Sequence, residues 1–484
     1  MRERNCRDNP SQGSRRDYRS FDPSVLQPTP EARGYAVREL ARRAGVSREF
    51  YRKWKIEVAI DRTIVSLGSE AAGEIHFLHE KERVLETISR DTIPVARAAW
   101  LSAPPVSMAP PDLLLPFCEP NSDPSQPLYQ RAGEHTLVCR LDLLLTFLFT
   151  LSRLEETLSR TKDEHDRFPA SASLALRHDF LDRPILDEHG LAFAQVLSSL
   201  LPAWCPQAKA MRIKLTHDID DVGIPFELHA SIGHSVKRRR PSATVRDFLA
   251  LFTAVEPGEL ALVHRLAAIS RARGLSSAFY WKASPPGPCD SGYDPSNGKI
   301  RRVIDRLREH GFEMGVHPGY QTFGDRTKLD AEVTLLRKAL GVTSPGGRQH
   351  YLRWSPETWL DWEACGLSYD SSLGFADKFG FRAGTAFPYR PWSLWENREI
   401  KLIEVPLILM DCTPVKYMKL GREKGLERIK TLIQRIAQTG GVFTLLWHNT
   451  PLLDPDYSGW YESILDLLAG AESFDVPASS EQLW

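Results

Sequence analysis

Strand-like and helix-like patterns alternate along the chain from residue 211 onward. Short apolar runs, typical of buried strands, are each followed by a longer segment with one apolar face, typical of a helix. This alternation predicts parallel strands joined by crossover helices, and about seven such units in one domain favour a closed or nearly closed barrel over an open doubly wound sheet. The expected strands are 212–215, 277–281, 313–316, 350–353, 403–409 and 442–447. The expected helices are 259–273, 300–310, 328–340, 356–365, 421–439 and 459–468.

Side chains that bind cations follow the ends of several of these strands. In parallel β/α folds the carboxyl ends of the strands converge on one face, where sites are built. Carboxylates and imidazoles can hold a divalent ion there and leave a position open for water, which predicts a metal hydrolase. For the first strand alone, an acidic turn that caps the next helix is the alternative. The residues at the strand ends are Asp218, Asp220, Asp221, His317, Arg353 and His448.

Two of these segments carry a resemblance to a known family: Thr216-His217-Asp218-Ile219-Asp220 and Leu445-Leu446-Trp447-His448. With them, residues 211–450 resemble the polysaccharide deacetylases, carbohydrate esterase family four. The resemblance implies an α/β fold with a distorted (β/α)7 barrel, one divalent metal ion, and removal of an N- or O-acetyl group from a saccharide. Zinc is the expected ion, with cobalt, nickel and iron as alternatives.

The same resemblance implies a role for each matching residue. Asp218 corresponds to the general base and Asp220 to a metal ligand. His317 corresponds to a second ligand and His448 to the general acid. The Arg-Trp-Tyr-Asp-Ser-Ser order of the family's third motif assigns Arg353 as the partner of the base.

The third metal ligand departs from the family pattern. The family has His-x-x-x-His, but the chain reads His317-Pro318-Gly319-Tyr320-Gln321, and an amide oxygen is a poorer ligand than imidazole for zinc-like ions. Gln321 is one candidate, and His350, at the start of the strand expected to carry Arg353, is another. The alternative for His350 is an ordinary buried histidine. A site without metal, in a domain that only binds glycans, is a third interpretation.

Two further segments are candidates for the mouth of the site. Residues 379–385 predict a glycine-hinged loop in which Arg382 contacts the substrate, and a plain surface turn is the alternative. The basic run Lys237–Arg240 lies in an insertion after the first strand. It predicts a solvated loop, or else a lid drawn to an anionic sugar.

The first 205 residues predict a smaller α+β accessory region before the barrel. Residues 1–30 have the composition of a disordered tail. We expect a small helical or α+β unit at 31–101, a proline-rich linker at 102–127, a helical region at 128–205 and the barrel domain at 206–484. Residues 142–184 resemble the region that precedes the barrel in one large subgroup of these deacetylases.

Residues 35–54 resemble a helix-turn-helix, with Gly45-Val46-Ser47 at the turn. One interpretation is a DNA-binding regulator that uses this segment and has the barrel as its sensor. We favour a helical hairpin used for packing, because the motif is short and runs into an apparent strand.

Composition limits the partners. With 62 basic and 62 acidic residues the formal net charge is +0, which makes nucleic acid an unexpected partner. The N-terminus lacks the apolar core of a secretory signal, the run Leu141–Leu151 is too short to span a membrane, and the seven cysteines show no CxxC pair. These features predict a cytoplasmic protein, with no expectation for its oligomeric state. The expected substrate is therefore an intracellular glycan precursor, and the main alternative is a non-catalytic glycan-binding protein on a decayed barrel.

Overall fold

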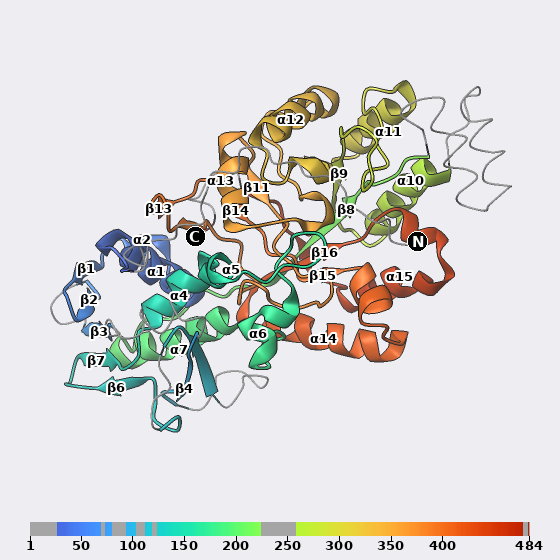
Figure 1. Ribbon diagram of the computed structural model, residues 1–484. Coiled ribbons are helices and arrows are strands. Elements are labelled where there is room, and N and C mark those ends of the chain that lie inside the picture. Colours follow the sequence, from blue (N-terminus) through green and yellow to red (C-terminus); the bar gives the residue numbers. More distant parts are fainter. Residues whose placement is uncertain are drawn as a thin grey trace.

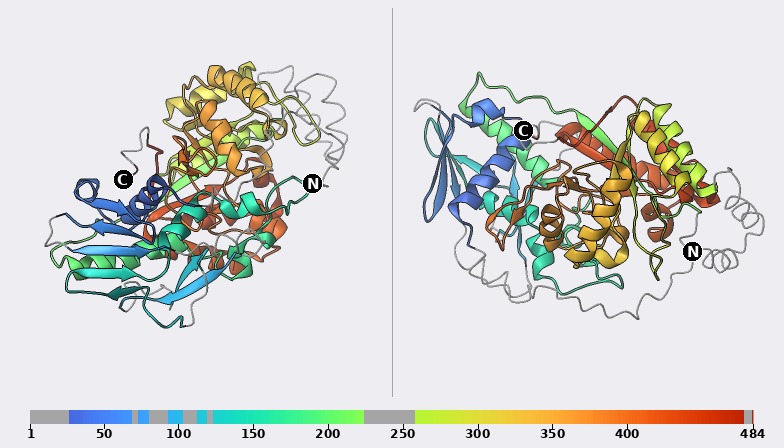
Figure 2. Two further views of the ribbon diagram at one scale, coloured as in Figure 1. Left: turned by 60° about the vertical axis from the view of Figure 1, so that its left-hand side comes forward. Right: turned by 90° about the horizontal axis from the view of Figure 1, so that it is seen from above.

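The computed structural model places an accessory region beside an α/β region (Figure 1). The two regions lie side by side in the other views as well (Figure 2). The expected tail 1–30 and the run Lys237–Arg240 fall outside the described residues, apart from 27–30. The structure describes residues 27–68, 73–79, 93–102, 112–118, 123–223, 258–477 and 483.

A five-stranded sheet forms one face of the accessory region. Its strand order is β1-β2-β3-β7-β6, and all neighbours are antiparallel except β3 and β7. Alternate side chains of β2, β3 and β7 are buried, as expected for a sheet with one face on the core. A separate antiparallel pair is formed by β4 and β5. The bounds are β1 Lys55–Val58, β2 Arg62–Ser66, β3 Glu74–Leu78, β4 Val95–Ala99, β5 Asp112–Pro116, β6 Tyr129–Arg131 and β7 Thr136–Cys139.

Three helices fill the accessory region between this sheet and the rest of the molecule. Helix α1 (Pro30–Arg43) is capped by the Thr29 hydroxyl and packs against α4 (Leu143–Leu151) and α7 (Ile185–Leu200). The approach of α7 to α1 requires Gly190, because a Cβ there would lie 2.6 Å from the backbone oxygen of Arg43. The shorter helices are α2 Arg48–Tyr51, α5 Leu154–Leu158, η3 Ala170–Ala172 and α6 Leu174–Arg177.

The accessory region is not divided where the sequence predicted. The expected linker 102–127 contains β5, whose Leu113, Leu114 and Leu115 are buried. Strand β3 from the first predicted unit pairs directly with β7 from the second. The prolines around this apolar run predicted a linker, whereas the run forms strand β5 and packs in the core.

Parallel strands form the centre of the α/β region, which confirms the predicted α/β class. Their order is β10-β9-β8-β16-β15, and every neighbouring pair is parallel. Strands β9 and β16 are buried along their whole length, as strands covered on both faces must be. The bounds are β8 Met211–Asp218, β9 Ser277–Trp281, β10 Glu313–Val316, β15 Leu409–Met410, β16 Gly441–Leu446 and β17 Glu472–Ser473, which pairs with the start of β8.

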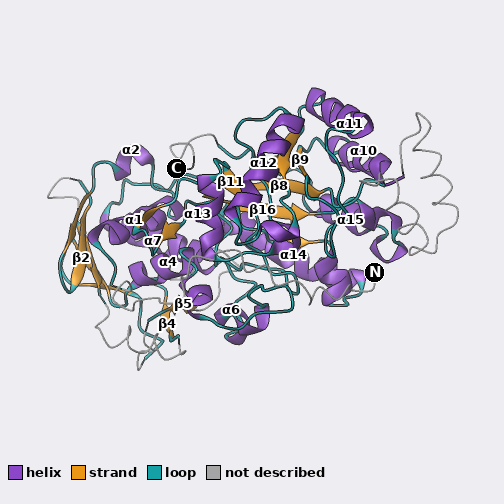
Figure 3. Cartoon of the chain, turned by 45° about the horizontal axis from the view of Figure 1, so that its top comes forward, coloured by secondary structure: helices purple, strands orange, loops and turns teal. Residues whose placement is uncertain are grey.

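Helices surround these strands (Figure 3). Each helix contributes an apolar face to the core, and all but the helix at 356–364 come after a strand, as the alternation in the sequence predicted. The helices are α10 Gly258–Arg271, α11 Gly298–Glu309, α12 Arg326–Leu340, α13 Pro356–Ala364, α14 Arg422–Thr439 and α15 Trp460–Leu467.

The expected strand at 350–353 is wrong. Residues His350–Leu352 form the 3-10 turn η5. The strand position between β10 and β11 (Tyr369–Asp370) is occupied by Gly347, which forms β-bridges to Val316 and to Asp370. A Cβ on Gly347 would lie 1.9 Å from the Val316 carbonyl oxygen. Glycine therefore permits a contact that a side chain would prevent, and the position carries no apolar strand signal.

One segment contacts both edges of the parallel sheet. Strand β14 (Ile403–Glu404) pairs with β11, whereas β15, only a few residues later, pairs with β16. Among the described residues, the strand pairings do not form the continuous ladder of a closed barrel. The number of seven β/α units therefore stays a prediction. The remaining elements are β12 Trp392–Ser393, β13 Arg398–Glu399, η4 Tyr320–Thr322, η6 Thr413–Tyr417, η7 Thr450–Leu453 and η8 Pro455–Tyr457.

Within the described ranges, no helix combines the length and the apolar character needed to cross a membrane.

Candidate metal centre

Three side chains from separate strand ends converge on one point. Asp220 follows β8, His317 follows β10 and His350 lies on η5, after the bridging Gly347. The Oδ1 atom of Asp220 lies 3.2 Å from His317 Nε2 and 3.3 Å from His350 Nε2. One ligand atom from each residue falls within 4.8 Å of the others, which is the geometry of a potential metal site.

The donor atoms of this group suit a cation. Asp220 Oδ1 and His317 Nε2 are both buried and have no hydrogen-bond partner among the described residues. Burial alone would raise the pKa of Asp220, but His350 and His317 hold it well below its usual range. His317 donates its Nδ1–H to the Arg348 carbonyl at 2.7 Å, which leaves Nε2 as a lone-pair donor toward the group. One carboxylate and two imidazoles therefore fit a zinc-like ion.

A buried carboxylate and a buried ammonium lie on the far side of His350. Asp290 Oδ1 lies 2.7 Å from His350 Nδ1 and 2.6 Å from Lys282 Nζ. Lys282 Nζ also lies 3.2 Å from His350 Nδ1 and 3.9 Å from Asp220 Oδ1. Lys282 follows β9 directly, so a polar residue at that strand end was a signal that sequence reasoning missed. No sequence pattern pointed to Asp290.

Asp218, the last residue of β8, lies beside the group and is paired with Arg348. Arg348 Nη1 donates to Asp218 Oδ1 at 2.9 Å and to the Thr216 hydroxyl at 2.9 Å. Its other nitrogens donate to the carbonyl and hydroxyl oxygens of Ser371. Both members of the pair are buried, so the guanidinium fixes the orientation of the carboxylate.

His448, after β16, also lies beside the group. Its Nδ1 lies 2.9 Å from Asp411 Oδ1, and its Nε2 lies 3.7 Å from Asp220 Oδ2. Burial alone would lower the pKa of His448, but Asp411 raises it well above its usual value. Asp411 directly follows β15, so a carboxylate at that strand end was a second signal that sequence reasoning missed. Asp411, Cys412 and His448 also form a group of potential ligands, but Asp411 already accepts hydrogen bonds from two backbone N–H groups.

The structure places two other predicted residues away from these roles. Arg353 does not pair with Asp218: its guanidinium donates to the carbonyls of His165 and Tyr320 and stacks 4.0 Å from the centre of the Tyr320 ring. The order of the family's third motif assigned Arg353, whereas the structure has Gly347 at the strand position and pairs Asp218 with the adjacent Arg348. Gln321 lies half-buried on η4, and the third nitrogen or oxygen beside Asp220 and His317 comes from His350.

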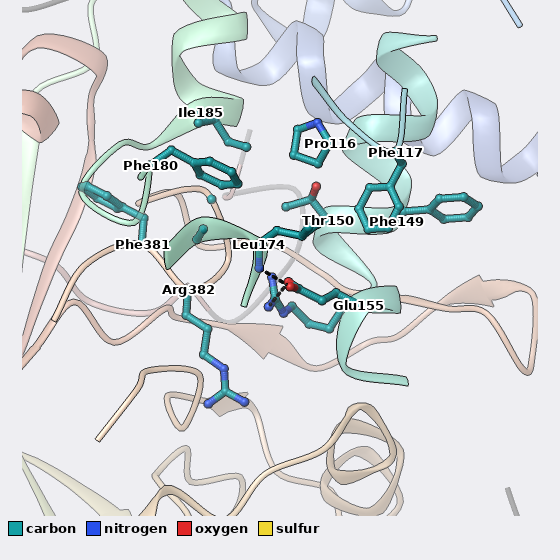
Figure 4. A pocket seen from close by; sticks show the side chains of 13 residues that line it. Pro116, Phe117, Phe149, Thr150, Glu155, Leu174, Phe180, Ile185, Phe381 and Arg382 are labelled. Carbon is teal, nitrogen blue, oxygen red and sulfur yellow. Dashed lines mark hydrogen bonds and ion pairs between the residues drawn. The ribbon is translucent and has the colours of Figure 1, made fainter. Parts of the chain in front are cut away.

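Arg382, predicted to contact substrate, is a buried structural residue. It forms a bidentate pair with Glu156 of the accessory region, at 2.9 and 2.5 Å, and donates to the Gly374 carbonyl. Its side chain is only 2% exposed. Figure 4 shows it extending away from a small cavity where the Glu155 carboxylate accepts a hydrogen bond from the Leu174 N–H. The glycines around Arg382 predicted a loop at the mouth of the site. The side chain instead joins the two regions through its pair with Glu156.

The helix-turn-helix-like segment is used for packing, as favoured from the sequence. Its second helix, α2, has only four residues and leads straight into β1. In the first helix, α1, Arg43 pairs with Glu39 and with Asp187 of α7, and Arg33, just before the segment, pairs with Asp142 at the N-cap of α4. These guanidiniums are buried and neutralised, so they are not presented to a nucleic acid.

His217 points away from Asp218, as strand alternation predicts. It is fully buried, its Nδ1 lies 2.8 Å from the Trp447 carbonyl oxygen, and its ring packs against Phe279. Burial lowers the pKa of His217 to about 4, so it is a neutral core residue rather than a ligand.

A family model matches the N-terminal part of the chain. Residues 27–202 match a model described as a family of unknown function, DUF7033. No curated protein matches the chain.

Solved structures resemble part of the chain at low identity. A candidate polysaccharide deacetylase from Mycobacterium smegmatis is 18% identical, with a TM-score of 0.38, over 55% of this chain and 87% of its own. A candidate polysaccharide deacetylase involved in O-antigen biosynthesis, from Bordetella bronchiseptica, is 16% identical, with a TM-score of 0.30, over 55% and 92%. PuuE allantoinase is 13% identical, with a TM-score of 0.38, over 58% and 92%. At these values the chemistry of the site rests on its own geometry.

Proposed function

We propose that this chain is a metal-dependent hydrolase that removes an acetyl group, as amide or ester, from a saccharide, and that its substrate is an intracellular glycan precursor. The observation that carries the proposal is the convergence of Asp220, His317 and His350, whose facing oxygen and nitrogen atoms lie close enough together to share one ion. A carboxylate–guanidinium pair and a carboxylate–imidazole pair lie beside this group.

Asp220, His317 and His350 would hold the ion, with zinc expected and cobalt, nickel or iron as alternatives. A bound divalent ion of this kind brings the pKa of a water molecule down to about 7 and polarises a carbonyl group. Three protein ligands leave a position for that water, as in other hydrolytic zinc sites.

Asp218 is the proposed general base. Arg348 holds its Oδ1, and its Oδ2 lies 3.7 Å from Nδ1 of His317, one of the three potential ligands. In this proposal the carboxylate accepts the proton of a water molecule beside Asp220. Correct orientation of a proton acceptor contributes roughly 10²–10⁴-fold to such reactions.

His448 is the proposed general acid. Asp411 binds its Nδ1, and its Nε2 lies 3.7 Å from Asp220 Oδ2, so Nε2 is the atom nearer to the group. A proton held at Nε2 can pass to the departing amine or alkoxide of the sugar. Acyl transfer to water requires both a proton acceptor for the water and a proton donor for the leaving group.

The test is acetate release by the purified full-length protein, with bound metal measured on the same sample. Acetylated chito-oligosaccharide serves for the amide and an O-acetylated xylo-oligosaccharide for the ester. Asp218→Asn and His448→Gln are each expected to lower kcat by roughly 10²–10⁴-fold, whereas Asp305→Asn, on the exposed face of α11, leaves it unchanged. The proposal is wrong if the purified protein binds no metal, or if Asp218→Asn keeps the wild-type activity.

A second candidate function is glycan binding without turnover, and the position of Lys282 favours it. Its ammonium lies 3.9 Å from Asp220 Oδ1 and is fully buried, so a resident cation already faces the ligand group. On this interpretation the wild type binds no zinc and binds sugar without releasing acetate. Zinc bound by the wild type at one ion per chain excludes it.

A further inference from the structure

The third potential ligand, His350, lies on a strained turn. Tyr351 and Leu352, which follow it, have φ values of +61° and +53°, a conformation that non-glycine residues adopt at a cost of about 1–3 kcal/mol each. Such backbone persists only where its surroundings hold it. The residues that hold this turn are therefore of interest for the metal centre.

A loop of the accessory region, residues 163–168, contacts the turn directly. Arg167 Nη1 donates to the Tyr351 carbonyl at 2.9 Å. In the other direction, Arg353 Nε, just after the turn, donates to the His165 carbonyl at 2.9 Å. The His165 ring lies 4.6 Å from the Tyr351 ring, which in turn lies 4.7 Å from the His350 ring. The loop thus contacts both the backbone and the ring of the residue next to His350.

Hydrogen bonds within the loop hold its own conformation, which it needs if it is to fix the turn. Asp163 accepts hydrogen bonds from the backbone N–H groups of His165 and Arg167, both at 2.9 Å. Its other oxygen accepts from Arg167 Nε at 2.7 Å. The guanidinium is therefore held at two ends, by Asp163 in its own loop and by Tyr351 in the α/β region.

We infer that the loop 163–168 is a working part of the metal centre, in which Arg167 is a positioning residue that fixes the His350 turn so that His350 Nε2 meets Asp220 and His317. The inference rests on the proposed metal centre. It gives a role to a region that otherwise matches only a family of unknown function. The accessory region completes the site rather than being a separate module.

The experiment measures zinc affinity of the full-length protein by competition with a chromophoric chelator. Arg167→Met is expected to weaken zinc binding about tenfold, the lower end of what lost outer-sphere partners cost, and Arg167→Lys to restore part of it. Arg160→Met, at an exposed position of the same region, is the matched control and retains wild-type affinity. If Arg167→Met does not fold, Asp163→Asn, which frees the same guanidinium, takes its place.

A spectroscopic measurement separates positioning from general stability. At saturating cobalt, a displaced His350 changes the visible absorption of the bound ion in Arg167→Met but not in Arg160→Met. Wild-type zinc affinity and an unchanged cobalt spectrum in Arg167→Met overturn the inference and leave the proposed function standing. Failure of the wild type to bind either ion overturns both.

Discussion

Arg348 Nη1 donates a hydrogen bond to Asp218 Oδ1 across 2.9 Å, and both side chains are buried at the end of the first strand of the α/β region. Removing one member of such a pair leaves an unpaired charge in the interior, which costs about 3–5 kcal/mol. We therefore expect Arg348→Met to lose that much free energy of unfolding. Adding Asp218→Asn to it should recover part of the loss, because the buried carboxylate is then neutral.

Urea denaturation of the two single variants and the double variant measures this coupling. Strictly additive effects would mean that Asp218 does not depend on Arg348.

The contact of Gly347 with β10 predicts a second effect on stability. A Cβ there would lie 1.9 Å from the Val316 carbonyl oxygen, so Gly347→Ala should cost about 3 kcal/mol or more. The matched control is Gly298→Ala at the start of α11, where a Cβ meets only an Arg302 side-chain atom at 3.9 Å. The control is expected to be neutral or stabilising by about 0.4–1 kcal/mol. Equal melting temperatures for the two variants would contradict the placement of Gly347 as the bridge.

Glu155, buried between the two regions, predicts a pH dependence of stability. Burial raises the pKa of Glu155 to about 7, although Arg153 opposes the shift. Because this is above the unfolded value of 4.5, the folded chain binds more protons, and the contribution to stability is lost as the pH rises through about 7. Glu155→Gln, which mimics the protonated form, should therefore stabilise the protein by about 3 kcal/mol at about pH 8.5 and by little at about pH 4.

Chemical denaturation at the two pH values gives the difference between wild type and variant. Glu134→Gln, at a side chain that is 89% exposed, is the control and should show no such difference. A gain in Glu155→Gln that is the same at both pH values would show that the carboxyl does not titrate as expected.

Tyr351 offers a prediction for substrate binding. The residue is 36% exposed, and its ring centre lies 4.7 Å from that of His350, at the edge of the proposed site. An aromatic face contributes about 1 kcal/mol beyond its buried area, so Tyr351→Leu should raise KM for an acetylated oligosaccharide about five- to tenfold. Zinc affinity should stay closer to the wild-type value than in Arg167→Met, because the substitution keeps the backbone carbonyl that accepts the hydrogen bond from Arg167. A normal KM would place the sugar elsewhere.

Strong local patterns allowed much of the α/β region to be predicted. The strands Ser277–Trp281 and Glu313–Val316 occur at the predicted bounds, because each is a short apolar run between clear breaks. Asp218, Asp220, His317 and His448 lie together, because parallel strands bring their carboxyl ends to one face.

The features that could not be predicted depend on contacts between distant segments. The strand position occupied by Gly347 has no hydrophobic signature, so the adjacent Arg348 was not predicted as the partner of Asp218. Arg382 gives no sign in the sequence that Glu156, more than two hundred residues away, will neutralise it. The pairing of β3 with β7 likewise crosses a segment whose prolines suggested a linker.

The most direct measurement of the central claim is zinc binding by the wild type, His350→Ala and Gln321→Ala. Asp220, His317 and His350 as ligands predict one zinc ion per wild-type chain and a loss of affinity of about a hundredfold or more in His350→Ala, with Gln321→Ala close to wild type. Wild-type zinc affinity in His350→Ala, or a loss confined to Gln321→Ala, would contradict the account.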